Sequence, residues 1–171
     1  ASGFDLILTI GGASVGDYDL VRTVIEKNDW KLGFYKVAMR PGKPTFFGHF
    51  NNIPLLGLPG NPVSAGVVSV VFLSTLVNQL LGAIYSTTRI KVAELKGRLK
   101  KNGDRQDYIR GFVNFSVNGK ITTSPIEKQD SAMMTNFANA DCLILRPPLS
   151  PAIQSGDHVE ILLLDGLQMK T

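Results

Sequence analysis

LPGNPVS, Leu58 to Ser64, is the stretch that decides the fold of this chain. The apolar residues before it close a strand, and Pro59-Gly60 turns the backbone tightly. Asn61 is a favoured helix N-cap and Pro62 a favoured first helical residue, because the N–H that proline lacks would be unpaired there anyway. The stretch therefore predicts a strand, a turn and a bare helix N-terminus. Such an end binds anions in α/β proteins, although an ordinary strand–helix turn would have the same residues.

An alternation of strands and helices surrounds this stretch. Phe4 to Ile10 is short and continuously apolar, which predicts a buried parallel strand. Asn51-Asn52 separates two apolar runs and predicts a hairpin connection. The predicted elements are strands at 4–10, 34–40, 45–50 and 53–58 and helices at about 19–27 and 62–81.

The pattern changes after Tyr85, where short alternating segments replace the strand–helix order. These segments predict a small β-rich, barrel-like domain. Its predicted strands lie at 90–96, 108–117, 120–124, 142–146 and 158–164, with one short helix at 131–139. The fold expected is α/β, with a partial three-layer α/β/α domain at 1–86 followed by a β-barrel-like domain at 87–171.

Composition narrows the classes of function. Hydrophobic residues make up 44% of the chain, as in a globular protein, and 18 Lys and Arg against 14 Asp and Glu leave a net charge of +4. This mild excess suits an anionic small ligand, and the basic residues are too scattered for a nucleic-acid partner. Cys142 is the single cysteine, so the default is a reducing, cytoplasmic setting. The apolar run at 67–81 is interrupted by polar residues and is interpreted as a buried helix, not a membrane span.

A glycine-rich loop, GGASVGD at 11–17, follows the first predicted strand. Such a loop can point several N–H groups at a phosphate, with the Ser14 hydroxyl added, or it can be an ordinary glycine turn. Asp17 and Asp19 beside it are suitable Mg²⁺ ligands, because Mg²⁺ takes few protein oxygens and keeps its waters. Helix capping is the alternative role for Asp19.

A basic turn, KVAMRPGKP at 36–44, follows the next predicted strand. Alternation along a strand would put Lys36 and Arg40 on one side, and a type II turn would bring Arg40 and Lys43 within about 7 Å. Two cations held together by a rigid Pro-Gly turn indicate an anion between them, with a solvated basic turn as the alternative. In the β-rich part, Arg110 is either a solvated strand residue or an arginine that reaches across to the basic site of the first domain, and Ser131 is by default a helix N-cap.

Taken together and in this order, GGASVGDYD, RPGKP and GLPGNPVS resemble the molybdopterin molybdotransferase family, the MoeA-type proteins, and are similar to the E domain of gephyrin. The resemblance covers essentially the whole chain, with YIRG, SAMMTNFANAD and SGDHVEILLL in the barrel part. It implies a MogA-like first domain and insertion of molybdate into adenylylated molybdopterin, with hydrolysis of the adenylate and with Mg²⁺.

The resemblance also implies site residues. It assigns Asp19, Arg40 and Lys43 to catalysis, and Asp17 with Asp19 to the metal. It assigns molybdate binding to Arg40, Lys43, Arg110 and Ser131. Binding of the molybdopterin substrate would fall to Gly11, Gly12, Ser14, Gly16, Lys36, Pro59, Gly60, Asn61, Pro62 and Ser64.

Family members carry further domains before the part matched here and form homodimers. The chain is therefore expected to be a C-terminal fragment that does not turn over by itself, with a homodimer and contact with a molybdopterin adenylyltransferase as expected partnerships. Two other functions remain open: a molybdopterin adenylyltransferase-like binding enzyme, and a gephyrin-like scaffold. The barrel part argues against the first, and the missing linker or partner domain against the second.

Overall fold

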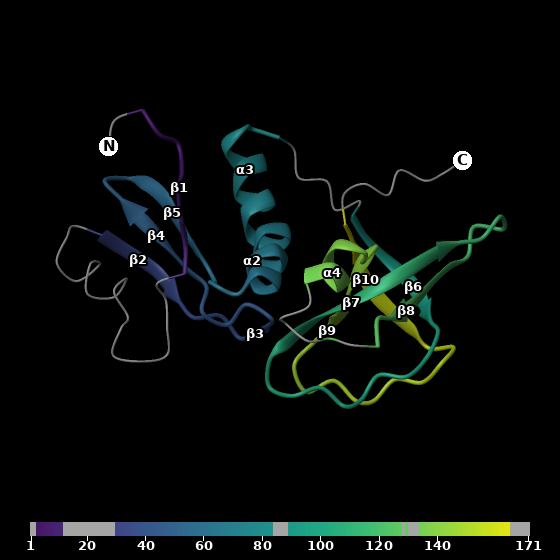
Figure 1. The fold of residues 1–171 in the computed structure, drawn as a ribbon. Helices are drawn as coiled ribbons and strands as arrows, with labels where there is room; N and C mark the ends of the chain where they lie inside the picture. The colour runs from purple at the N-terminus through teal and green to yellow at the C-terminus, as the bar shows by residue number, and fades with distance from the viewer. Residues whose placement is uncertain (1–2, 12–29, 84–88, 128, 130–133, 165–171) are drawn as a thin grey trace. The chain divides into compact units, whose positions relative to one another are not determined.

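A computed structural model describes residues 3–11, 30–83, 89–127, 129 and 134–164, and the chain divides into two compact units, 1–85 and 86–171 (Figure 1). The predicted helix at 19–27 lies outside the described residues. Each unit is described by itself below.

The first unit is built on a four-stranded mixed sheet. Its strands are β1 (Ile7–Ile10), β2 (Trp30–Tyr35), β4 (Phe46–Phe50) and β5 (Ile53–Leu58), in the order β1-β5-β4-β2. β1 runs parallel to β5, and β4 is antiparallel to both β5 and β2. The carboxyl ends of β1 and β5, the start of β4 and the end of β2 therefore lie at one edge of the sheet.

The turn between β4 and β5 follows the sequence prediction. Asn51 and Asn52 have φ values of 49° and 66°. Two-residue hairpins of the favoured twist need positive φ at both positions, and asparagine accepts it more readily than most residues. The predicted hairpin is confirmed.

The sequence predicts a buried first strand, and the prediction is wrong about the burial of this strand. Exposure alternates along β1, and Leu8 and Ile10 are 44% and 74% exposed. Within the described residues β1 pairs with β5 only, so it is an edge strand and one of its faces is uncovered.

The helix after β5 runs along one side of the sheet (Figure 1). It consists of α2 (Pro62–Val68), a π-helical segment (Ser69–Leu73) and α3 (Ser74–Leu80). At the start of α3, the Ser74 and Thr75 hydroxyls donate to the carbonyls of Val70 and Val71 in the π-helical segment, at 2.6 and 3.0 Å. The predicted helix is confirmed. Its π-helical middle segment was not predicted from the sequence.

By length and composition this helix could span a membrane, with a mean hydropathy of 1.7 over its most apolar window. The same properties mark a helix that packs on a sheet, and Val63, Val67 and Val68 are fully buried in the first unit. We therefore interpret it as a core helix.

The predicted strand at 34–40 is broken, which corrects the alternation argument. β2 ends at Tyr35, Lys36 has a φ of 67°, and only Met39–Arg40 (β3) is again extended. The break arises because residues 36–45 form the loop that joins β2 to β4. The two-residue period of a strand therefore does not relate Lys36 to Arg40.

The second unit contains a closed barrel of five strands: β6 (Ile90–Leu95), β7 (Gln106–Phe115), β8 (Ile121–Pro125), β9 (Cys142–Arg146) and β10 (His158–Leu163). The order is β7-β8-β6-β10-β9, and pairing of β7 with β9 closes the ring. The short helix α4 (Met134–Ala138) precedes β9. The barrel prediction is confirmed. Its core is Ala93, Leu95, Leu99, Cys142, Ile144, Val159 and Ile161.

Candidate functional site

The glycine corner and the proline corner lie side by side at the carboxyl edge of the first sheet. Ile10 is the register partner of Leu58, and the N–H of Gly11 donates to the carbonyl of Leu58 at 2.9 Å. A Cβ built on Gly11 would stand 3.7 Å from the Cα of Gly60. Parallel strands end at the same edge, so the two turns meet where α/β sheets bind their ligands.

The helix start beside them is capped, not bare. The Asn61 Oδ1 accepts hydrogen bonds from the Ser64 N–H, at 2.9 Å, and from the Ser64 hydroxyl, at 3.1 Å. Pro62 occupies the first helical position, as predicted. Pro62 has no N–H and the Ser64 N–H is used by the cap, so neither supplies an amide to a ligand. The Asn61 Nδ2 still has its two N–H donors to offer to a ligand.

The basic loop 36–45 closes at the same edge. The N–H of Lys36 donates to the carbonyl of Thr45 at 2.9 Å, and that of Val37 to the carbonyl of Lys43 at 3.0 Å. Thr45 is fully buried, and its hydroxyl donates to the carbonyl of Gly42 at 2.6 Å. These bonds fix the shape of the loop, which also contains a cis Arg40–Pro41 peptide bond.

At Gly42 this loop packs closely against the helix. Its φ is 119°, and a Cβ there would stand 2.8 Å from the Val68 Cγ2 and 2.9 Å from the Met39 Sδ. Only glycine fits both the conformation and the space. The loop is therefore seated on the helix that begins at the proline corner.

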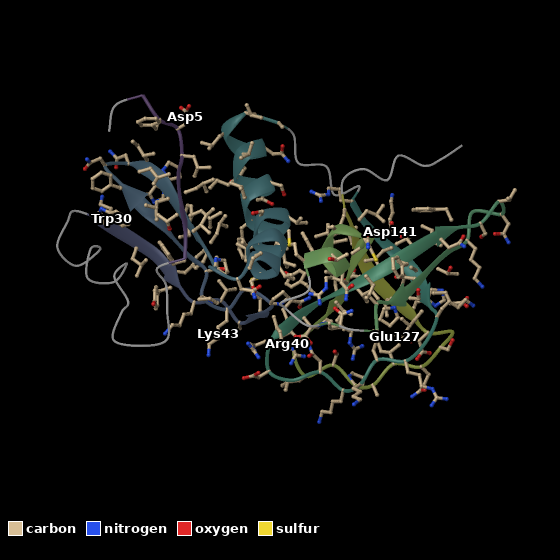
Figure 2. All side chains as sticks on the ribbon, viewed as in Figure 1. Asp5, Trp30, Arg40, Lys43, Glu127 and Asp141 are labelled. Atoms are coloured by element: carbon tan, nitrogen blue, oxygen red, sulfur yellow. The ribbon has the colours of Figure 1, made fainter. Side chains whose placement is uncertain are left out.

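Three exposed cations, Lys36, Arg40 and Lys43, stand on this seated loop. Figure 2 shows Arg40 and Lys43 on it, at the end of the first unit away from Trp30. The Lys36 Nζ lies 5.0 Å from the centre of the Tyr35 ring, a cation–π contact that sequence reasoning missed. Strands lie about 4.8 Å apart, so the edge from β1 to β2 is roughly 14 Å long.

The structure thus gathers nine of the predicted site residues at one sheet edge. They are Gly11, Lys36, Arg40, Lys43, Pro59, Gly60, Asn61, Pro62 and Ser64. Six others lie outside the described residues: Gly12, Ser14, Gly16, Asp17, Asp19 and Ser131.

Arg110 belongs to the barrel of the second unit. It lies on β7 and is 1% exposed, so the interpretation as a solvated strand residue is wrong. Its backbone N–H donates to the Gln129 Oε1 at 3.0 Å. No sequence signal pointed to Gln129. The other fully buried arginine, Arg146, donates to the carbonyls of Lys100 and Pro151, which gives it a structural role in joining loops.

Within the described ranges, no three His, Cys, Asp or Glu side chains gather as metal ligands. Asp17 and Asp19, the predicted Mg²⁺ ligands, are outside those ranges.

Comparisons with known proteins show what each part of the chain is similar to. Residues 1–79 match the family described as "Probable molybdopterin binding domain", and residues 92–164 match the "MoeA C-terminal region (domain IV)". The chain is 34% identical over 158 residues to the molybdopterin molybdenumtransferase of Haemophilus influenzae, covering 92% of this chain and 39% of that protein. It is 31% identical over 160 residues to that of Bacillus subtilis, covering 94% and 37%.

A solved structure, the molybdopterin biosynthesis MoeA protein of Pyrococcus horikoshii, superposes with a TM-score of 0.71 at 28% identity. It covers 93% of this chain and 37% of the archaeal one. The chain thus spans less than two fifths of the length of these relatives. Because the two family matches together span most of the chain, and a relative at 34% identity matches 92% of it, the chain belongs to the MoeA family.

Proposed function

We propose that this chain is the ligand-binding and barrel portion of a molybdopterin molybdotransferase, which inserts molybdate into adenylylated molybdopterin. The observation that carries the proposal is the shared sheet edge. A glycine corner, a capped helix start and a seated basic loop all stand there, in the unit that matches a molybdopterin-binding family.

The dimensions of the edge suit an elongated anion. At roughly 14 Å it is several times longer than a single oxyanion, so one end can hold a phosphate while the other meets molybdate. Gly11 and Gly60, whose backbones approach each other closely, lie at the first end, where we place the phosphate. Arg40 and Lys43 supply fixed positive charge at the second. Cations held in place stabilise a dianion as it approaches a ligand that is already anionic, because they need no reorientation when the ligand arrives.

Several further properties belong to the same proposal. Asp17 and Asp19 would hold Mg²⁺, whose bound charge would lessen repulsion between the two anions. Arg110 and Ser131 would contact molybdate from the barrel unit. We also propose a cytoplasmic homodimer that meets a molybdopterin adenylyltransferase, and that this chain by itself does not turn over. Measured molybdate insertion by this chain would contradict that last point.

The alternatives receive less support. An adenylyltransferase-like enzyme would need no second unit, whereas residues 92–164 match the MoeA C-terminal region. A scaffold role needs no basic loop at the carboxyl edge of the sheet.

The test is titration of the chain with tungstate, a molybdate analogue, by calorimetry. Replacing Arg40 and Lys43 together by alanine should abolish binding. The matched control replaces Lys31, exposed on β2, and Lys101, exposed in the barrel unit, which changes the net charge equally. Loss of binding in the first pair alone supports the site, while unchanged affinity in the first pair contradicts it.

A further inference from the structure

Strand β7 changes partners at the residue next to Arg110. Residues 107–111 of β7 pair with β9, whereas residues 111–115 pair with β8. The last register pair with β8 joins Gly111 to Pro125, where β8 ends. Arg110 therefore sits one residue beyond the end of that ladder.

Beyond the end of β8, the side chain of Gln129 takes the place of a strand. The N–H of Ile126 still donates to the Arg110 carbonyl at 2.9 Å, after which the chain leaves the ladder. The Gln129 Oε1 accepts from the Arg110 N–H at 3.0 Å, and its Nε2 donates to the Arg110 carbonyl at 2.9 Å. The Nε2 also donates to the Ile126 carbonyl at 2.6 Å. A carboxamide has the same donor and acceptor as a peptide group, so Gln129 completes the ladder that β8 leaves open.

The chain on the other side of Arg110 is fixed as well. The carbonyl of Gly111 accepts from the Asp141 N–H at 2.9 Å, and the Asp141 Oδ2 accepts from the Val113 N–H at 3.0 Å. A Cβ on Gly111 would stand 2.9 Å from the Ser124 carbonyl oxygen. Backbone movement at Arg110 is thus limited by the packing of Gly111, by the Ile126 N–H and by the side chain of Gln129.

We propose that Gln129 is a positioning residue, which holds the backbone of Arg110 so that this arginine is presented to an oxyanion. The proposal rests on the function proposed above, in which Arg110 contacts molybdate. Gln129 acts through Arg110 and does not touch the anion. Without the Gln129 amide, the N–H of Arg110 loses its acceptor, and either water enters from the exposed side of Gln129 or the backbone shifts, so that Arg110 is held differently.

The experiment compares two variants of the chain by tungstate calorimetry. Gln129→Met keeps the length of the side chain and removes every hydrogen bond, and Gln129→Glu keeps the acceptor and removes the two donor bonds. Both variants should bind tungstate about tenfold more weakly. This is the lower end of the loss in affinity that follows when a residue orienting a direct ligand of a bound ion is replaced. Gln154→Met, an exposed glutamine of the same unit, is the matched control and should bind as the unaltered chain does.

Two further measurements distinguish the positioning role of Gln129 from a purely structural one. Cys142 is buried in the barrel core, so its alkylation rate reports barrel opening. The side-chain Nε–Hε NMR signal of Arg110 reports its position. The proposal expects the Arg110 signal to shift in Gln129→Glu at an alkylation rate like that of the unaltered chain. An unmoved signal with undiminished tungstate affinity would overturn it, even if Gln129→Met fails to fold.

Arg110→Ala distinguishes failure of this inference from failure of the proposed function. If Arg110→Ala binds tungstate normally, Arg110 is not an anion contact and this inference falls, whereas the proposed function is decided by the Arg40 and Lys43 variant. If Arg110→Ala loses binding while both Gln129 variants keep it, only the positioning role of Gln129 is overturned.

Discussion

The backbones of Gly11 and Gly60 lie in direct contact: a Cβ on Gly60 would stand 3.4 Å from the Cα of Gly11. Each glycine follows a strand, and the two strands run parallel as neighbours. Because neither residue has a side chain, the two turns can approach each other this closely. The two positions nevertheless differ, since Gly11 has a φ of 77° and Gly60 has an ordinary one.

Alanine should therefore be tolerated at one of these glycines and not at the other. Gly11→Ala should lower the free energy of unfolding by about 1 kcal/mol, the cost of a left-handed alanine. Gly60→Ala needs no strained φ and its Cβ makes ordinary contact, so it should change stability by only a few tenths of a kcal/mol. Urea unfolding followed by fluorescence of Trp30, the single tryptophan and a residue of the first unit, measures both. Equal effects would contradict the assigned conformations.

Stability and anion binding should move in opposite directions at Asn61. Asn61→Asp keeps an oxygen for the Ser64 N–H and adds negative charge at a helix start, so it should preserve or raise stability. It also replaces the Nδ2 donors by a carboxylate oxygen, which should weaken tungstate binding. Asn61→Ala should instead cost about 1 kcal/mol of stability. Asn78→Ala, at the exposed far end of the same helix, is the control. Tungstate affinity unaffected by the aspartate would argue against a ligand at this corner.

Gly57 should be the least replaceable glycine of the first sheet. It is the register partner of Phe46, and a Cβ there would overlap the fully buried Phe46 ring. Gly57→Ala should destabilise the first unit by about 3 kcal/mol, the upper end of ordinary overpacking. Adding Phe46→Leu should restore part of the loss, because the two residues share one space. Trp30 fluorescence again follows the unfolding, and simple additivity of the two changes would contradict the overlap.

The barrel should lose stability in acid through Glu94. Its carboxylate pairs with Lys120 at 2.5 Å and Lys96 at 2.6 Å, and the hydrogen bonds from these lysines lower the pKa of Glu94 from 4.5 to about 2. A lowered folded-state pKa contributes stability above pH 4.5, and this contribution is lost as the pH falls towards 2.

Glu94→Gln should accordingly be less stable than the unaltered chain at pH 6 and nearly equal to it at about pH 2. The methyl NMR signals of Ala93 and Val159, buried in the barrel core, follow urea unfolding of this unit. Asp104→Asn is the control, because Asp104 is 92% exposed and its only described ion pair is long, at 3.9 Å. Parallel pH curves for Glu94→Gln and the unaltered chain would exclude the effect.

Local signals in the sequence predicted the fold well. Asn51-Asn52 and Asn61-Pro62 each specify a backbone conformation within two residues, and both conformations are present. The strands of the barrel were recognisable because alternation is also a local property. The glycine, proline and basic corners could be placed at one edge once the strand order was known.

Features that depend on distant partners could not be predicted in this way. Lys36 takes a left-handed φ where the chain leaves β2 for a loop that is closed by bonds to Thr45 and Lys43, which lie farther along the sequence. Gln129 owes its bonds to the place where β8 ends. The burial of Arg110 likewise follows from the tertiary structure, since its apolar neighbours in the sequence fit either an exposed or a buried arginine.

The π-helical segment Ser69–Leu73 has a consequence for how this chain tolerates changes in length. A wide turn of this kind holds one residue more than a regular helix needs. Deleting a single residue there would restore an even α-helix while leaving every strand of the sheet intact. Because the wide turn absorbs the extra residue, α3 would keep its orientation about the helix axis after the deletion. The segment is thus a point at which the loss of one residue would leave both the outer half of the helix and the sheet edge where its inner half begins in place.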